Sequence, residues 1–287
     1  MERLAIITGA DSGMGFEETR AVAQKGYHTI MACFCPKKAE AKCQELIRET
    51  GNSHIEVMGI DLATLSSVRA FADRVKERFG RLDLLMNNAG TMETGYHYTV
   101  DGLERTISVN YVGPYLLTRL LLPLMDEGSR IVNTASCVYP LGSLHFPQFF
   151  ERGMRGCWWR IFPYFNSKLA VTLFTIDLSR RVRERGITVN AVDPGIVSTN
   201  IIRMQKWFDF LTDLIFRPFI RTPRQGADTA IHLLLDEDKA GQTGDLYRSN
   251  RIVKLGAKYT QHPKMQELWE RTEEAVRPFL LDEGCAG

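Results

Sequence analysis

A tyrosine and a lysine one helical turn apart offer acid–base chemistry. Tyr164 and Lys168 stand in the run YFNSK, and residues four apart lie on the same face of a helix. A nearby cation favours the phenolate and lowers the pKa of a tyrosine from about 10 toward neutrality. Such a tyrosine exchanges a proton with an alcohol or carbonyl oxygen at physiological pH. The spacing alone arises by chance in many helices, so the rest of the chain decides.

A glycine-rich turn near the start of the chain offers phosphate binding. The apolar run at 3–8 predicts a strand, the turn TGADSGMG at 8–15 follows at once, and a helical pattern begins at Met14. Strand, glycine turn and helix is the arrangement that dinucleotide binding requires. Glycines let a pyrophosphate approach backbone amides at the positive end of a helix. The alternative interpretation is an ordinary tight turn.

Small or polar residues also stand where later apolar strands end, which is where ligands bind an open parallel sheet. They are NNAG after the strand at 82–86, Ser136 at the end of 130–136, and Pro194-Gly195 after 187–192. Thr134 offers a second hydroxyl on the same strand face as Ser136. Ser136 lies nearer the strand end and is therefore our candidate.

The elements that would position these residues alternate regularly along the chain. Predicted strands lie at 3–8, 27–34, 54–60, 82–86, 130–136, 187–192 and 245–248, with helices such as 37–50, closed by Gly51, and 65–79, ended by Gly80. This alternation predicts an α/β fold, a doubly wound parallel sheet (Rossmann) of about seven strands with helices on both faces. The 287 residues fit a single domain without internal repeats.

Composition narrows the class of protein. The hydrophobic content of 44% and the charged content of 24% are ordinary for a globular chain. A formal net charge of +2, without a basic patch interleaved with aromatics, predicts no nucleic-acid partner. Met1 leads almost directly into the first strand and no apolar run reaches about 18 residues, so we expect neither a signal peptide nor a transmembrane helix.

The cysteines do not suggest a metal site. They stand at positions 33, 35, 43, 137, 157 and 285, without a pair of ligand doublets. We interpret them as free thiols in a reducing compartment, with no bound metal. A cytoplasmic location fits this interpretation best.

Taken together and in this order, the motifs resemble those of the short-chain dehydrogenase/reductase family, in its compact one-domain form. They are the glycine turn, NNAG at 87–90, SVNYVG at 108–113, the strand-end serine, YxxxK and Pro-Gly, and the resemblance spans about 3–276. The phrases MNNAGTMETGYHYTVDGLERTISVNYVGPYLLTRLLLP and IDLATLSSVRAFADRV resemble retinol- and steroid-dehydrogenase-like members in particular.

This resemblance implies an NAD(P)-dependent oxidoreductase. Its substrate would be an apolar steroid-, retinoid- or lipid-like molecule, on which hydride transfer interconverts a secondary alcohol and a ketone or aldehyde. The alternative is a regulatory or scaffolding protein that keeps the fold and the nucleotide without turnover. A homodimer or tetramer and a weak contact with a membrane surface are left open.

The resemblance also assigns catalytic roles. Tyr164 would be the general acid when a carbonyl is reduced and the base when an alcohol is oxidised. Lys168 would lower the pKa of Tyr164 and bond the nicotinamide ribose, while Ser136 would donate a hydrogen bond to the substrate oxygen. Asn110 would stand at a helix irregularity and hold a water that links Lys168 to solvent. An asparagine that simply faces solvent is the alternative at Asn110.

The implied cofactor site draws on the glycine turn, the strand ends and the catalytic helix. Asp61, just beyond the third strand, is where this family contacts the adenine ring. The implied cofactor-binding residues are Thr8, Gly9, Asp11, Ser12, Gly13, Met14, Gly15, Phe34, Lys37, Asp61, Leu62, Asn88, Ala89, Gly90, Tyr164, Lys168, Pro194, Gly195, Val197 and Thr199.

The end of the second strand bears on the choice of nicotinamide cofactor. An NAD site places an acid there to bond the ribose 2′-hydroxyl, but this chain has Cys33-Phe34 and no acid nearby in the sequence. Lys37 and Lys38 could reach a 2′-phosphate, or they are two solvated lysines. The missing acid removes repulsion of the phosphate, so NADP(H) is favoured over NAD(H).

Two segments interrupt the regular alternation. The insertion at 140–163 separates Ser136 from Tyr164, and we expect its aromatics to pack on the core and wall the substrate pocket. These aromatics are Phe146, Phe149, Phe150, Trp158, Trp159 and Phe162. The alternative is contact with a membrane surface, helped by Arg152, Arg155 and Arg160.

The second segment, 198–221, predicts an amphipathic helix. Apolar residues recur at spacings of three and four, at Ile201, Met204, Phe208, Leu211 and Ile215. The resemblance implies a mobile substrate lid here, directly after Pro194-Gly195. An ordinary core-facing helix is the alternative.

Overall fold

The computed structural model describes residues 3–93, 97–146, 148–150, 161–197 and 221–281. The predicted lid helix falls almost wholly outside these residues, as do Thr199, Trp158, Trp159 and the three arginines of the insertion. Among the described helices, none combines the length and the apolar composition that crossing a bilayer would need.

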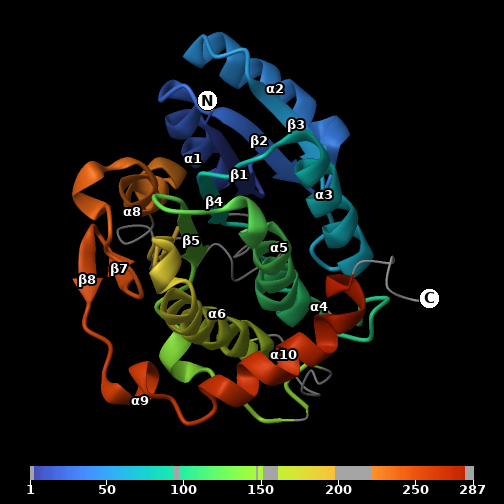
Figure 1. Cartoon of the computed structure of the whole chain (residues 1–287), viewed down its shortest axis with the longest axis vertical. Coiled ribbons are helices and arrows are strands. Elements are labelled where there is room, and N and C mark those ends of the chain that lie inside the picture. The colour runs from blue at the N-terminus through green and yellow to red at the C-terminus, as the bar shows by residue number, and fades with distance from the viewer. Residues whose placement is uncertain (1–2, 94–96, 147, 151–160, 198–220, 282–287) are drawn as a thin grey trace, which may run out of the picture.

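An eight-stranded sheet with helices on both faces organises the molecule (Figure 1). Its order is β3-β2-β1-β4-β5-β6-β7-β8, and all neighbours run parallel except β7 and β8. The strands are β1 Leu4–Thr8, β2 His28–Cys33, β3 Ile55–Gly59, β4 Leu84–Asn87, β5 Arg130–Thr134, β6 Thr188–Val192, β7 Leu246–Arg248 and β8 Arg251–Val253. The doubly wound α/β fold predicted from the sequence is therefore confirmed.

The predicted strands agree with the structure to within one or two residues at each end, whereas β8 was not predicted. It has only three residues, pairs antiparallel to β7, and exposes Arg251 and Ile252. A two-residue turn joins the two strands, with Ser249 and Asn250 both at positive φ. Such turns usually carry Asn-Gly or Asp-Gly, so Ser-Asn at this point gave no clear signal.

Helices cover both faces of the sheet. They are α1 Gly13–Gln24, α2 Pro36–Thr50, α3 Leu65–Arg78, α4 Arg105–Ile107, α5 Gly113–Leu121, α6 Ile161–Arg181, α8 Pro223–Leu235, α9 Ala257–Thr260 and α10 Met265–Leu280. A π-helical turn, Ser108–Val112, joins α4 to α5. Gly51 closes α2, as predicted, and adopts the left-handed conformation, whereas α3 ends at Arg78, two residues before Gly80.

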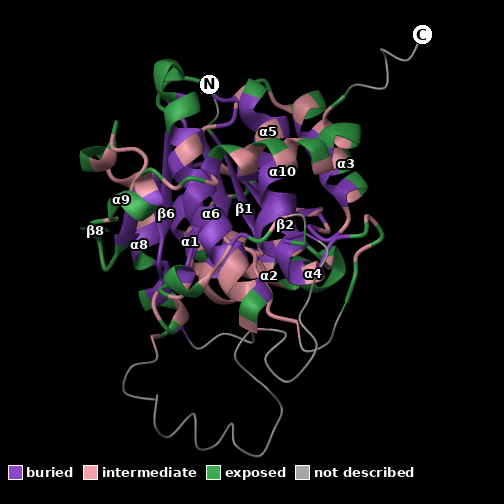
Figure 2. Ribbon diagram, turned by 90° about the horizontal axis from the view of Figure 1, so that it is seen from below, coloured by how far each residue is buried: buried purple, intermediate pink, exposed green. Residues whose placement is uncertain are grey.

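The side chains of β1 show how the two cores form. Leu4 and Ile6 point to the cluster beneath α3, α5 and α6, whereas Ala5 and Ile7 point to the cluster beneath α1, α2 and α8. Successive side chains of a strand alternate between the faces of a sheet, so a strand covered on both faces must be apolar throughout. Figure 2 shows this buried interior within an exposed outer layer.

The C-terminal helix α10 lies across α3, α5 and α6 (Figure 1). Tyr111 and Thr272 share a hydrogen bond of 2.8 Å, and Tyr115 donates one of 2.6 Å to Glu273. Trp269 packs against Tyr115 with ring centroids 5.2 Å apart. The helix therefore closes the larger of the two cores.

Candidate active site

Three of the four catalytic candidates line one cavity at the carboxyl ends of β4, β5 and β6. β5 ends at Thr134, Ser136 follows it, and α6 contributes Tyr164 and Lys168. The cavity has a volume of about 200 Å³. Its remaining lining residues are Met14, Asn88, Gly90, Met92, Thr134, Ala135, Cys137, Val138, Pro194, Gly195, Ile196 and Val197.

Tyr164 is half-buried at the cavity wall, and its surroundings act on the phenol in opposite senses. Burial, the largest cause, raises its pKa, while a hydrogen bond with Ser136 lowers it. The net direction is upward, so the pKa decrease predicted from the spacing to Lys168 is wrong for this arrangement. The two candidate hydroxyl residues nevertheless line the same cavity.

Lys168 lies beside Tyr164 and is only 4% exposed. Its ammonium donates a hydrogen bond of 2.8 Å to the carbonyl oxygen of Thr134, and it lies 5.6 Å from the centroid of the Tyr164 ring. Burial lowers the pKa of Lys168 to about 8, and the negative charge of Asp193 partly opposes this. The lysine thus loses and gains its proton closer to neutral pH than a solvated lysine does.

Asn110 stands in the π-helical turn, so the predicted helix irregularity is confirmed. Its carboxamide accepts a hydrogen bond from the Thr91 amide (2.7 Å) and donates to the Thr91 carbonyl (2.9 Å) and to Ser167 Oγ (3.1 Å). The solvent-facing alternative is wrong, because Asn110 is buried. Single π-turns inside helices are frequent at functional sites. The water between Asn110 and Lys168 stays a prediction.

The glycine turn forms a cradle that side chains would fill. Gly9 and Gly13 adopt positive φ, at 65° and 57°. A Cβ on Gly15 would collide with the carbonyl oxygen of Gly9 and would lie 2.6 Å from Asn88 Nδ2. The side chain of Ser12, at the N-cap of α1, makes no capping hydrogen bond. The first amides of α1 are thus available to an anion such as a pyrophosphate.

A second cavity, of about 210 Å³, adjoins the first at Gly90, which lines both. The predicted residues that line it are Gly9, Asp11, Phe34, Asp61, Leu62, Ala89 and Gly90. Ala32, Ile60, Thr91, Glu93, Arg105 and Val109 complete its wall. Two adjoining cavities on either side of the glycine turn fit an extended ligand with two ends, as a dinucleotide is.

Other predicted cofactor residues line neither cavity. Thr8 is buried, and its hydroxyl accepts hydrogen bonds of 3.0 Å from the amides of Asn88 and Ala89, so it holds the loop after β4. Ser12 and Lys37 are exposed. The described cofactor candidates that line neither cavity are Thr8, Ser12, Gly13, Gly15 and Lys37.

One premise behind the cofactor preference needs correction. The sequence has no acid next to the end of β2, but the fold brings Asp11 there from the glycine turn. Burial, together with the charge of Asp11, raises the pKa of the neighbouring Cys33 to about 12. The acid was missed because it precedes the strand in the sequence.

Three of the four described aromatics of the insertion pack on the core. Phe149 and Phe150 are buried, with Phe149 6.1 Å from Tyr111 between ring centroids. Phe146 packs against Phe149, and Phe162 against Phe165. None of the four lines the catalytic cavity. The packing prediction is confirmed for Phe146, Phe149 and Phe150 but not for Phe162, which is 38% exposed. The pocket-wall prediction is wrong for these four residues.

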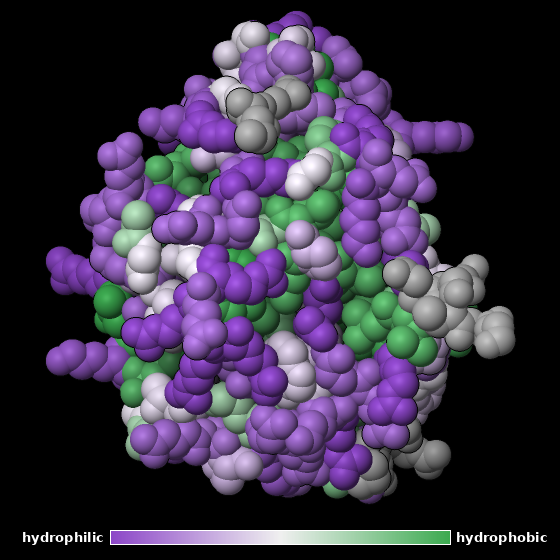
Figure 3. Space-filling view, in the orientation of Figure 1, coloured by the Kyte–Doolittle hydropathy of each residue, from purple (hydrophilic) through white to green (hydrophobic). Residues whose placement is uncertain are grey.

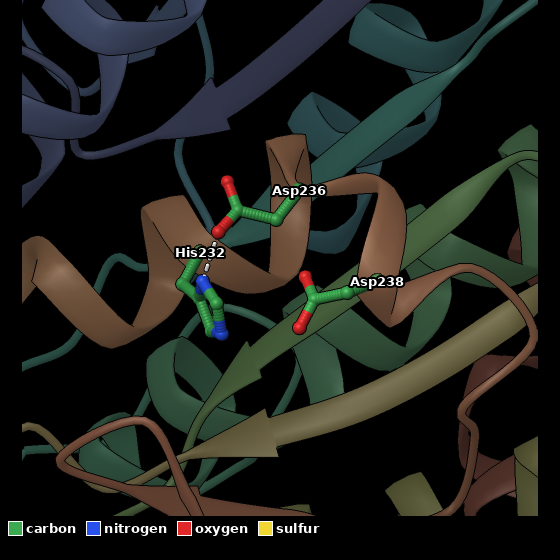
Figure 4. Close-up of side chains that lie close together, drawn as sticks. All are labelled: His232, Asp236 and Asp238. Carbon is green, nitrogen blue, oxygen red and sulfur yellow. Dashed lines mark hydrogen bonds and ion pairs between the residues drawn. The ribbon is translucent and has the colours of Figure 1, made fainter.

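A separate cluster of polar side chains lies at the end of α8 (Figure 4). His232 pairs with Asp236, and Asp238 pairs with Lys239 at 3.0 Å. Both carboxylates are exposed, and each already has a side-chain partner, His232 or Lys239. Ordinary surface contacts between polar side chains therefore account for this cluster, and it suggests no metal site.

The glycine cradle, the two adjoining cavities and the Ser–Tyr–Lys arrangement define an NAD(P)-dependent oxidoreductase. The chain belongs to the short chain dehydrogenase family, whose model matches residues 3–149 and 155–207.

Known proteins agree with this assignment. Retinol dehydrogenase 11 of Homo sapiens is 34% identical over 275 residues, which cover 93% of this chain and 84% of that protein. A solved structure from Mycobacterium paratuberculosis has a TM-score of 0.74 and 29% identity, covering 96% of this chain and 93% of its own. A short chain dehydrogenase from Burkholderia cenocepacia in complex with NADP has a TM-score of 0.68 and 25% identity, covering 85% and 94%.

Proposed function

We propose that this protein interconverts a secondary alcohol and a ketone or aldehyde on an apolar substrate by hydride transfer. The observation that carries the proposal is that Ser136, Tyr164 and the buried Lys168 line one cavity at the strand ends. Most of the other side chains in the cavity wall are apolar, including Met14, Met92 and Val138. Its similarity to retinol dehydrogenases supports a retinoid- or lipid-like substrate class.

The proposed residues divide the work of carbonyl reduction. The nicotinamide, when bound, would supply the hydride. Ser136 donates a hydrogen bond to the carbonyl oxygen, and Tyr164 gives that oxygen its proton. The raised pKa of Tyr164 keeps the phenol protonated near neutral pH, as a proton donor must be. Lys168 supplies positive charge beneath the site, and Asn110 fixes the loop at Thr91.

For the cofactor we propose NADP(H) over NAD(H). The similar structure from Burkholderia cenocepacia holds NADP, and Lys37 and Lys38 lie exposed at the start of α2. Asp11 acts in the opposite sense, because its carboxylate would repel a 2′-phosphate. Dissociation constants for NADPH and NADH, measured by fluorescence, test the choice, and tighter binding of NADH would overturn it.

Turnover is tested by following the absorbance of reduced nicotinamide against panels of steroid, retinoid and aliphatic carbonyls. We expect activity on apolar members of the panels. The Tyr164→Phe variant should bind nucleotide as the parent does and lose turnover by about 10²-fold or more. Full activity in this variant would refute the role of Tyr164. Nucleotide binding without turnover on any panel would favour the regulatory alternative.

A further inference from the structure

Asp193 is a fully buried carboxylate. Neither nucleotide binding at the glycine turn nor the proposed catalytic roles explain why a carboxylate is buried there. It is 0% exposed and follows β6 directly, immediately before Pro194-Gly195. Residues 194–197 line the catalytic cavity, but Asp193 itself does not. A buried charge must be paired and hydrogen-bonded to be tolerated, so its partners indicate what it does.

Each oxygen of Asp193 has a partner. Oδ1 accepts a hydrogen bond of 3.0 Å from the amide of Gly195, which adopts φ of 76°. Oδ2 accepts one of 2.5 Å from Arg248 Nε on β7, and the Asp193 amide donates one of 2.8 Å to the Tyr247 carbonyl. The carboxylate thus ties the cavity loop to the neighbouring strand.

Arg221 holds the same loop from its other side. Its guanidinium donates to the Pro194 carbonyl (3.3 Å) and to Ser249 Oγ (2.7 Å), and its amide donates to the Ile196 carbonyl (2.8 Å). The loop is therefore fixed to β7 and to the turn beyond it at two points. Only the point at Asp193 places a buried negative charge beside the cavity.

That charge reaches the proposed proton-transfer residues. Asp193 raises the pKa of Lys168 against the effect of burial, and it also raises the pKa of Tyr164. Cys137 is the other ionisable group that acts on Tyr164. Arg248 opposes the charge of Asp193 directly, through their ion pair.

We propose that Asp193 and Arg248 are a positioning pair, which fixes the loop at 194–197 and sets the electrostatic potential at Tyr164 and Lys168. The carboxylate anchors the Gly195 amide, and the guanidinium limits how much negative charge the site experiences. The inference rests on the proposed roles of Tyr164 and Lys168.

Substitutions at Asp193 and at Arg248 should shift the pH dependence of nucleotide binding and of turnover in opposite directions. Asp193→Asn keeps an oxygen for the Gly195 amide but removes the negative charge that raises the pKa values of Tyr164 and Lys168. Both pKa values should therefore fall, and the pH dependence should move down by ~0.5–1 unit. Arg248→Gln leaves the carboxylate without its cation, so the pH dependence moves up by a similar amount. A role limited to stability would not produce opposite shifts.

Asp193→Ala separates anchoring from charge. This variant loses the acceptor for the Gly195 amide as well as the charge, so the dissociation constant for NADPH should rise by about 2- to 10-fold relative to Asp193→Asn. The pH shift should match that of Asp193→Asn. Equal nucleotide affinity in the two variants would refute the anchoring role.

The experiment uses the full chain and reads nucleotide binding across pH. Dissociation constants for NADPH and NADH come from fluorescence titration, and kcat and KM for all-trans-retinal, or the best carbonyl of the panels, follow in parallel. Glu273→Gln is the matched control, because it breaks an ion pair with Arg119 between α10 and α5. Thermal unfolding of each variant confirms that it is folded, and Arg248→Gln, with its half-exposed side chain, is the mildest change.

Opposite shifts for Asp193→Asn and Arg248→Gln, with none for Glu273→Gln, would support the proposal. Shifts in the same direction, or no shift in either variant, would overturn it. Because the titrations need no turnover, they test the pair even if every carbonyl fails. Loss of the proposed function would show separately, as full activity of Tyr164→Phe or as no turnover at all.

Discussion

At the scale of single residues, burial is the strongest influence on the groups proposed to move protons. It raises the pKa of Tyr164 and lowers that of Lys168 to about 8, so burial shifts each group toward its neutral form, although Lys168 still carries its charge at neutral pH. The YxxxK spacing identified the pair but not this balance, because spacing does not show where the lysine amine is directed. In the fold, the amine is held by the Thr134 carbonyl.

The raised pKa of Tyr164 predicts opposite pH dependences for the two reaction directions. Carbonyl reduction needs the protonated phenol, so its kcat/KM should hold through neutral pH and fall on the alkaline side. Alcohol oxidation needs the phenolate and should rise with pH. Steady-state kinetics in both directions from about pH 6 to about pH 10 provide the check. An oxidation rate that declines with rising pH over this range would contradict the assignment.

The burial of Glu18 on α1 leads to a second prediction, which concerns the free energy of unfolding. It is buried with Oε2 lacking a hydrogen-bond partner, and burial raises its pKa from 4.5 to about 8. Below the lower value both the folded and unfolded states are protonated. Between the two values only the unfolded state ionises, so the free energy of unfolding falls as pH rises, by at most ~1.4 kcal/mol per pH unit.

Glu18→Gln should remove this pH dependence. Urea unfolding at several pH values should find the variant more stable than the parent near pH 8, with the difference shrinking toward pH 4.5. Glu40→Gln, which changes an exposed glutamate on α2, is the control. A constant difference at every pH would exclude this explanation.

At the scale of elements, the glycine turn should be the least tolerant part of the nucleotide site. Gly15→Ala places a Cβ against the Gly9 carbonyl and 2.6 Å from Asn88 Nδ2. The cradle must then open, and we expect affinity for NADPH and NADH to fall by about 10-fold or more. Fluorescence titration measures the loss.

The matched control for this change is Gly51→Ala at the end of α2. Gly51 also has positive φ, but no atom would lie within 4 Å of its Cβ. It should cost ~1 kcal/mol of stability through backbone strain and leave nucleotide affinity unchanged. Equal binding losses in the two variants would show that the glycine cradle has no special role.

Continuous apolar runs made the buried strands predictable, because strands covered on both faces need such runs. Contacts between distant segments were not predictable in this way. Asp11 reaches the end of β2 from an earlier loop, and Asp193 meets Arg248 across 55 positions of sequence. Polar partners so far apart leave no local pattern. The sequence places Asp193 directly before Pro194-Gly195, but that neighbourhood does not reveal Arg248 as its partner.

At the scale of the whole molecule, α10 determines how much of the larger core meets solvent. The helix covers Tyr111 in the π-helical turn and Tyr115 in α5. Its Trp269 packs near Phe174 of α6. The guanidinium carbon of Arg181 lies 3.9 Å from the centroid of the Trp269 ring. On the face shown in Figure 3, polar side chains surround recessed apolar surface. Removing α10 would add a further apolar area to the exterior.

Ending the chain after Lys264 should therefore cause self-association through the uncovered faces of α5 and α6. Large exposed apolar patches drive protein association, and the nucleotide cradle lies at the strand ends rather than under α10. Light scattering coupled to size exclusion measures the mass, and fluorescence titration shows whether NADPH still binds. Leu268→Ala, in the full chain, removes one buried side chain of the same helix and should cost ~2–3 kcal/mol of stability without changing the mass. A truncated chain with the same association state as the parent would mean that α10 does not protect this surface.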